Sequence, residues 1–273
     1  MDIVWQSDDG QVAIWQMDGT DKTAEVKITI NPGIEWSVCG VGDFDQDGNS
    51  DILFQNGTRV GVWIMDGTSP KTVPEADETT KIFEIGSGTV VGVKDNLIYL
   101  QDDDPITVWE MDADEDGKPV IANQSILAVP STGWRFSAVG DFDNDGQLEV
   151  AIRHNRGSVV IADTGTFKLV GVNPGLTTWK IVGATDLDQD GSVDLIWENT
   201  TFGDVLLAVW FVNSLTVPIT DAIGEILVSA HVRAIGNFGQ PAVVLQNDNG
   251  DDAEIWLLNA NSVASTVTIG LPT

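Results

Sequence analysis

Three short segments of the sequence concentrate carboxylates at the same spacing. They read DFDQDG at 43–48, DFDNDG at 141–146 and DLDQDG at 186–191, and each is followed by an acid at the ninth position of the pattern D-x-D-x-D-G-x-x-[DE]. Like charges this close together repel one another, so three copies require a common explanation. Either the segments are solvated hairpin turns, or a cation lies among the carboxylates.

The spacing favours a divalent cation. Positions one, three and five of a tight turn place their oxygens on one side, and the glycine at position six supplies the left-handed backbone that the turn needs. A carbonyl at position seven and the carboxylate at position nine can complete the shell of about six to eight oxygens that calcium takes, whereas magnesium prefers a rigid octahedron with retained water. We therefore predict three calcium sites, formed by Asp43, Asp45, Asp47, Asn49 and Asp51; by Asp141, Asp143, Asp145, Gln147 and Glu149; and by Asp186, Asp188, Asp190, Ser192 and Asp194.

The acidic segments belong to a repeat that runs along the whole chain. Segments such as VAIWQMDG (12–19) recur, and their tryptophans follow one another after 48, 46, 101 and 46 residues, at Trp15, Trp63, Trp109, Trp210 and Trp256. The double spacing contains SVVIADTG (158–165), where we place Val160 at the tryptophan position. The chain therefore consists of six units of about 46–51 residues.

Each unit has the pattern of strands and turns. Apolar residues alternate or form short runs bounded by Gly, Asp and Asn, with almost no helical period. We assign strand A before each acidic segment, strand B after it, then the tryptophan-bearing strand C and strand D. Four antiparallel strands repeated at this length predict an all-β fold, a β-propeller of six blades with the acidic loops between strands A and B.

The chain begins at strand B, because Asp2 aligns with the ninth-position acids Asp51, Glu149 and Asp194. One blade therefore has three strands, or its fourth strand lies outside this chain. We predict a single propeller domain over residues 1–273, and a segment cut from a longer array is the alternative. The six repeats are expected at roughly 1–42, 43–92, 93–140, 141–185, 186–236 and 237–273.

The acidic loops are not EF-hands. That motif needs a bidentate acid at position twelve, where this chain has Phe54, Ile152 and Trp197. With their flanking strands, GDFDQDGNSDILF, GDFDNDGQLEVAI and TDLDQDGSVDLIW resemble the FG-GAP/VCBS repeats of integrin-type propellers. The resemblance implies nine-residue calcium loops between strands A and B. It also implies extracellular binding of protein or glycan ligands, as in fungal lectins of similar repeats.

Three units lack the acidic pattern: the first has no such loop within this chain, and we expect no metal in the third and the sixth. The third has VGVKDNLIYL, with Lys94 close to where the acids would be, and the sixth carries Pro241 in place of the ninth acid. A further segment, DADEDG at 112–117, fits the first six positions but has Val120 at the ninth. It is either a plain exposed hairpin, which we favour, or an additional metal site.

The composition excludes several classes of partner. Forty-two acids against 13 Lys and Arg give a formal net charge of −29, which repels nucleic acid and anionic membranes. The longest apolar run, VLLAVWFV at 205–212, is too short to span a bilayer. A strand-like DIVW follows Met1 directly, so no signal peptide is visible and we expect a processed or excised domain. The single Cys39 excludes an internal disulfide.

Most of the ten tryptophans recur at fixed repeat positions, including Trp36, Trp134 and Trp179 before strand A. Such aromatics favour packing between blades over a sugar-stacking surface. A small basic island of Arg153, His154 and Arg156 is either an exposed turn or a site for an anionic ligand.

Together, these patterns favour a non-enzymatic calcium-binding module for extracellular ligand binding or adhesion, with a glycan or protein ligand. A polysaccharide-active enzyme that uses the central channel and a structural spacer of a larger surface protein are the alternatives. Chance pairs among 42 acids cannot identify a glycosidase.

Overall fold

A computed structural model describes residues 2–71, 80–85, 88–101, 105–163, 166–172, 178–199, 205–212, 220–226, 230–247, 252–260 and 262–270. All regular structure in these residues is β-strand. The chain divides into two compact units, one of residues 2–16 and 24–132, the other of residues 17–23 and 133–270. The first acidic loop lies in the former unit and the other two lie in the latter. No helix in the described residues is long and apolar enough to cross a membrane.

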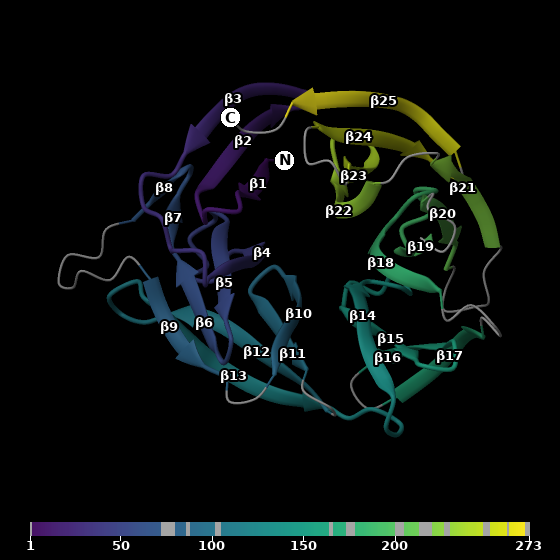
Figure 1. Ribbon diagram of the computed structural model, residues 1–273. Coiled ribbons are helices and arrows are strands. Elements are labelled where there is room, and N and C mark those ends of the chain that lie inside the picture. The colour runs from purple at the N-terminus through teal and green to yellow at the C-terminus, as the bar shows by residue number, and fades with distance from the viewer. Residues whose placement is uncertain are drawn as a thin grey trace. The chain divides into compact units, whose positions relative to one another are not determined.

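The strands form antiparallel sheets from consecutive chain segments (Figure 1). This arrangement follows from short polar turns between short apolar runs. The first three sheets consist of β1 (Ile3–Gln6), β2 (Val12–Asp18) and β3 (Asp21–Lys27); β4 (Ser37–Gly42), β5 (Asp51–Asn56), β6 (Arg59–Trp63) and β9 (Thr80–Glu84); and β10 (Thr89–Lys94), β11 (Leu97–Gln101), β12 (Ile106–Ala113) and β13 (Pro119–Leu127). A small hairpin, β7 (Met65–Asp66) with β8 (Ser69–Pro70), interrupts the second sheet between β6 and β9.

The remaining three sheets repeat the four-stranded order. They consist of β14 (Trp134–Gly140), β15 (Glu149–His154), β16 (Ser158–Asp163) and β17 (Thr166–Val172); β18 (Trp179–Thr185), β19 (Asp194–Asn199), β20 (Val205–Trp210) and β21 (Thr220–Ile226); and β22 (Ala230–Asn237), β23 (Pro241–Asn247), β24 (Asp252–Asn259) and β25 (Ser262–Gly270). The sheet β1–β3 has three strands, which correspond to B, C and D of the predicted unit.

The predicted repeat boundaries fall inside the sheets. The boundaries at 42, 140 and 185 follow β4, β14 and β18, and those at 92 and 236 lie within β10 and β22. The sequence repeat therefore begins at the acidic loop, whereas each four-stranded sheet begins one strand earlier.

A shared irregularity aligns the four-stranded sheets residue by residue. The first strand of each sheet has a register shift at the same place relative to its partner, just after Val38, Val90, Phe136, Ile181 and Val232. A bulge of this kind bends the strand and increases its local twist. The common bulge makes it possible to compare equivalent positions directly.

This alignment corrects two sequence assignments. In the second sheet Trp63 pairs with Ile52, the residue after the ninth-position acid. The equivalent residue of the fourth sheet is Val150, and it pairs with Ala162. Ala162, and not Val160, therefore occupies the tryptophan position. A small residue replaces the tryptophan, so no bulky side chain marked the position in the sequence. In the sixth sheet Ala242 pairs with Gly236 and occupies the ninth position, while Pro241 precedes it.

The core lies between successive sheets within each unit. In the first unit, one cluster joins Ile14 of β2 to Phe54 and Trp63, and a second joins Phe44 and Leu53 to Trp109 of β12. Because each sheet buries its apolar face against a neighbouring sheet, a single sequence repeat is not expected to fold stably by itself.

The second unit follows the same plan. Ala151 and Ile161 pack against Trp197 and Trp210, and a further cluster joins β19 and β20 to β23 and β24. Trp63, Trp109 and Trp210 are 1%, 5% and 6% exposed. The packing role predicted for the repeated tryptophans is confirmed for these three, because each belongs to a cluster shared by two sheets.

Candidate metal centres

All three acidic loops connect the first and second strands of their sheets, as predicted. The first acidic loop (43–51) joins β4 to β5, the second (141–149) joins β14 to β15, and the third (186–194) joins β18 to β19. The ninth-position acid is the first residue of the second strand in each case.

The loops share a backbone conformation with two left-handed positions. The glycines at position six, Gly48, Gly146 and Gly191, have φ values of 91°, 86° and 96°. Position four is also left-handed, with φ values of 57°, 60° and 62° at Gln46, Asn144 and Gln189. The sequence predicted the left-handed glycine at position six. It did not predict the left-handed conformation at position four, which non-glycine residues adopt infrequently.

The first-position acid holds the turn together. Asp43 accepts hydrogen bonds from the backbone N–H of Asp47 at 3.0 Å and of Gly48 at 3.0 Å, and Asp141 accepts from Asp145 and Gly146 at 3.1 and 2.8 Å. In the third loop Asp186 accepts from Gly191 at 3.1 Å. These bonds form within five residues, so local spacing encodes them.

The apolar residue at position two anchors each loop in the core. Phe44, Phe142 and Leu187 are 0%, 0% and 1% exposed. Their backbone N–H groups donate to the ninth-position acids Asp51, Glu149 and Asp194 at 2.8, 2.8 and 2.9 Å. Our sequence reasoning missed this anchor, although its signal is an apolar residue between two acids in all three copies.

Two of the ninth-position acids also hold the next hairpin. Asp51 accepts a hydrogen bond from the backbone N–H of Met65 at 2.9 Å, and Asp194 accepts one from Val212 at 2.9 Å. The pKa of Asp51, Glu149 and Asp194 is raised to about 7, mainly by burial and in smaller part by the neighbouring loop carboxylates, against the opposing effect of the backbone hydrogen bonds. These acids therefore serve the fold as well as the charge cluster.

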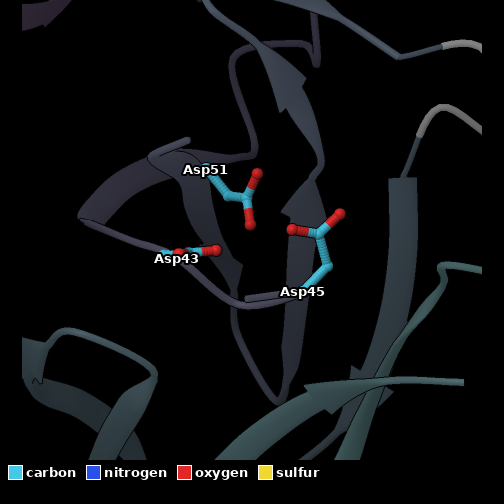
Figure 2. A group of neighbouring side chains, drawn as sticks. All are labelled: Asp43, Asp45 and Asp51. Atoms are coloured by element: carbon cyan, nitrogen blue, oxygen red, sulfur yellow. The ribbon is translucent and has the colours of Figure 1, made fainter. Parts of the chain in front are cut away.

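Positions one, three and nine come together in each loop. In each group, one carboxylate oxygen from each of the three acids lies within 4.8 Å of those of the other two. The groups are Asp43, Asp45 and Asp51; Asp141, Asp143 and Glu149; and Asp186, Asp188 and Asp194. Figure 2 shows the first group, whose carboxylates turn towards a common space. Desolvation and the nearby Asp190 raise the pKa of Asp188. Three acids at this separation oppose one another unless protons or a cation neutralise them.

Two oxygens in these groups fit a cation. Among the described residues, Oδ1 of Asp143 and Oδ1 of Asp186 are buried and have no hydrogen-bond donor. A buried carboxylate oxygen without a donor is costly, and a hard cation satisfies it. The donor set therefore fits a divalent metal.

The predicted ligands at positions five and seven lie outside the three groups. Position-five Asp47, Asp145 and Asp190 instead accept hydrogen bonds from the backbone N–H of position-seven Asn49, Gln147 and Ser192, each at 2.8 Å. The contribution of positions five and seven to a metal shell stays a prediction.

A lysine that the sequence did not point to contacts the first acidic loop. Lys71, just after β8, hydrogen bonds to Oδ2 of Asp47, and its Nζ lies 3.5 Å from Oδ2 of Asp45. This contact lowers the pKa of Asp47 and raises that of Lys71. The signal was hidden because Lys71 is 24 residues from Asp47 along the chain.

The third sheet has a short turn where the acidic loops lie in other sheets, and the DADEDG segment forms a different hairpin. The short turn is Asp95–Asn96, with Leu97 at the ninth position, and Nζ of Lys94 lies 3.6 Å from Oδ1 of Asp95. The DADEDG segment forms the β12–β13 hairpin, in which Asp114 accepts hydrogen bonds from the backbone N–H of Asp116 and Lys118 at 3.0 and 2.9 Å. Within the described residues, neither turn belongs to a group of three clustered acids.

The basic island is split between a strand and a turn. Arg153 and His154 belong to β15, and Arg156 lies in the following turn. The Arg153 guanidinium lies 5.6 Å from the ring centre of Trp197, and His154 meets Trp134 edge-on at 5.1 Å. Anion binding by this island stays a prediction.

Comparisons with known proteins address the family and the fold. The sequence model of the FG-GAP-like repeat matches residues 1–81, which include the first acidic loop. The predicted resemblance is thus confirmed over that part of the chain. No curated protein sequence matches the chain.

Solved structures resemble the whole chain at low identity. A chain of a Nidogen/Laminin complex is 13% identical, with coverage of 97% of this chain and 93% of that chain and a TM-score of 0.59. The β-propeller domain of Myceliophteria thermophila Cps50 (Swd1) is 12% identical, with coverage of 97% and 82% and a TM-score of 0.50. The fold is a β-propeller. At these identities the likeness concerns the fold alone.

Proposed function

We propose that this chain is a calcium-binding β-propeller module that acts outside the cell in ligand binding or adhesion. The calcium is structural, with one ion in each acidic loop. Asp43, Asp45 and Asp51 hold the first ion, Asp141, Asp143 and Glu149 the second, and Asp186, Asp188 and Asp194 the third.

One observation carries the metal proposal. Each loop gathers three carboxylates within 4.8 Å, and in two of them a buried carboxylate oxygen has no donor among the described residues. A bound divalent cation supplies the missing partner and offsets the repulsion among the acids. When bound, calcium supplies charge neutralisation and holds the loop in one conformation.

Calcium is favoured over magnesium and zinc. All the clustered donors are carboxylate oxygens, whereas zinc sites usually include Cys or His. Calcium also tolerates irregular ligand geometry, while magnesium demands a near-ideal octahedron. Extracellular calcium modules bind at roughly 0.1–1 mM, so millimolar calcium stabilises each loop by ~0.5–2 kcal/mol.

The proposed role of the loops is binding rather than catalysis. The first- and ninth-position acids already accept hydrogen bonds from loop backbone, a task suited to a scaffold. FG-GAP-like repeats over residues 1–81 support an extracellular setting, with a glycan or protein as the ligand. A formal net charge of −29 disfavours nucleic acid and anionic membranes as partners.

Calorimetric titration of calcium-stripped protein tests the metal proposal. We expect three calcium sites and much weaker magnesium binding. Excess chelator should lower the melting temperature by several degrees, since about 1 kcal/mol corresponds to about 2–4 °C at this size. An unchanged melting curve in chelator, or metal bound beside Lys94 or Ala242, would contradict it.

A glycan array with calcium and then with chelator tests the ligand. Glycan binding that requires calcium supports a lectin-like module. No glycan binding in either condition favours a protein partner or a spacer. Depolymerisation of a bound polysaccharide would instead identify an enzyme.

A further inference from the structure

The first acidic loop already contains a cation of the protein itself. The ammonium of Lys71 lies 3.5 Å from Oδ2 of Asp45, a member of the candidate metal group, and hydrogen bonds to Oδ2 of Asp47. The side chain of Asp45 is 5% exposed and that of Lys71 is 36% exposed. The lysine therefore reaches from the rim of the loop towards a buried carboxylate.

The position of Lys71 is set by the fold. The β7–β8 hairpin turns the chain back on itself, and the backbone N–H of Lys71 donates to the carbonyl of Ile64 at 2.8 Å. Ile64 directly follows β6 and is 5% exposed. The backbone of Lys71 is thus fixed on the core of its sheet, within reach of the loop.

The second acidic loop has a different partner at the same place. Oδ2 of Asp145, the equivalent of Asp47, accepts a hydrogen bond from the side-chain amide of Gln147 at 3.0 Å. This neutral donor comes from the loop itself, and in the first loop the side-chain amide of Asn49 donates in the same way to Oδ1 of Asp47 at 3.0 Å. The contact with Lys71 is therefore what the first loop adds. Oδ1 of Asp143, the equivalent position to Asp45, is buried with no donor among the described residues.

We propose that Lys71 is a built-in competitor for calcium at the first acidic loop, so that this loop binds the ion more weakly than the second and fills after it. The inference rests on the proposed calcium function. A divalent cation that enters the group of Asp43, Asp45 and Asp51 meets a positive charge close to one of its ligands. The lysine must withdraw to solvent before the loop can close around calcium.

The consequence is a graded response. At low calcium the second acidic loop is occupied while Lys71 neutralises part of the first. At higher calcium the ion displaces the ammonium, and the end of the β7–β8 hairpin loses a tether to the loop. The first acidic loop thus responds to a higher calcium concentration than the second.

The test compares substitutions of Lys71 in protein whose other loops are disabled. With Asp141→Ala and Asp186→Ala present, the first acidic loop is the remaining intact site for calorimetric titration. Lys71→Met retains the aliphatic chain without the charge, and Lys71→Arg retains the charge. Lys27→Met, at an exposed lysine of β3, is the control for the same change in net charge.

We expect Lys71→Met to tighten calcium binding by about tenfold. The calcium affinity of Lys71→Arg and of Lys27→Met should stay within about twofold of that of the protein with both lysines unchanged. Equal tightening by Lys71→Met and Lys27→Met, or no tightening by Lys71→Met, overturns the role of Lys71. If calcium binding to the first acidic loop is too weak to measure in the double variant, Lys71→Met is tested with all three loops intact. It must then lower the calcium concentration at which the last ion binds. No calcium binding by the otherwise unsubstituted protein overturns the proposed function as well, which separates the two failures.

Discussion

The first and second acidic loops are built alike at the backbone and differ in the charge that meets the position-five carboxylate. In both, the first-position acid accepts from the amides of positions five and six, and the ninth-position acid accepts from the amide of position two. Both also have left-handed residues at positions four and six. The loop frame is therefore a product of hydrogen bonds within nine residues.

The difference lies at position five. Asp47 and Asp145 each accept a hydrogen bond from the side-chain amide at position seven of their own loop, and Asp47 also pairs with Lys71 from another part of the sheet. The comparison teaches that loop shape and loop charge are set separately. Local residues set the shape, and a residue distant along the chain changes the charge within the loop.

The largest expected effect concerns the shared frame. Asp51→Ala removes the acceptor for two buried amides, those of Phe44 and Met65, and Glu149→Ala removes the acceptor for that of Phe142. We expect a loss in the free energy of unfolding of about 2–6 kcal/mol for Asp51→Ala and about half of that for Glu149→Ala. Urea unfolding in chelator measures both.

Asp47→Ala and Asp145→Ala are the matched controls at exposed positions of the same loops. Each should cost less than about 1 kcal/mol in chelator. If Asp51→Ala is as mild as Asp47→Ala without calcium, the frame depends on the metal rather than on the hydrogen bonds.

The second expected effect concerns the charge difference. Asp43→Ala and Asp141→Ala remove equivalent first-position acids. Under the proposed function each of their loops contributes ~0.5–2 kcal/mol of calcium-dependent stability. Because Lys71 competes in the first loop, Asp43→Ala should reduce the calcium-induced rise in melting temperature less than Asp141→Ala does. Thermal unfolding with millimolar calcium and with chelator gives both differences. A greater loss for Asp43→Ala would reverse the proposed order of the loops.

The third expected effect is a pH dependence common to both loops. The pKa of Asp51 rises from 3.8 to about 7 and that of Glu149 from 4.5 to about 7 on folding, mainly through burial. The calcium-free folded state therefore binds more protons than the unfolded state between these values, and its stability should fall as the pH rises from ~4 towards ~7. Calcium should offset this loss, because the cation favours the ionised acids.

Denaturant unfolding of calcium-stripped protein across this pH range measures the slope. The double variant Asp51→Asn with Glu149→Gln should show a shallower slope, since those two groups no longer titrate. An identical slope in the variant would assign the pH dependence to the other acids of this strongly negative chain.

The strands and the acidic loops were largely predictable from the sequence because their causes are local. Alternating apolar residues bounded by turn residues determine strands, and an acid five residues before a glycine determines the turn that Asp43 and Asp141 close. The packing of Trp63 and Trp109 followed from their repetition, because a unit that recurs must bury the same face each time. These features require no knowledge of distant contacts.

Only the tertiary structure decided which residues meet across the repeat. The pairing of Val150 with Ala162 depends on the register of two strands, and a small residue at that place left no mark in the sequence. The bond from Met65 to Asp51 and the contact of Lys71 with Asp45 and Asp47 depend on where a hairpin folds back. Spacing along the chain encodes interactions within a turn, but the reach of a long side chain depends on where its backbone is held in space.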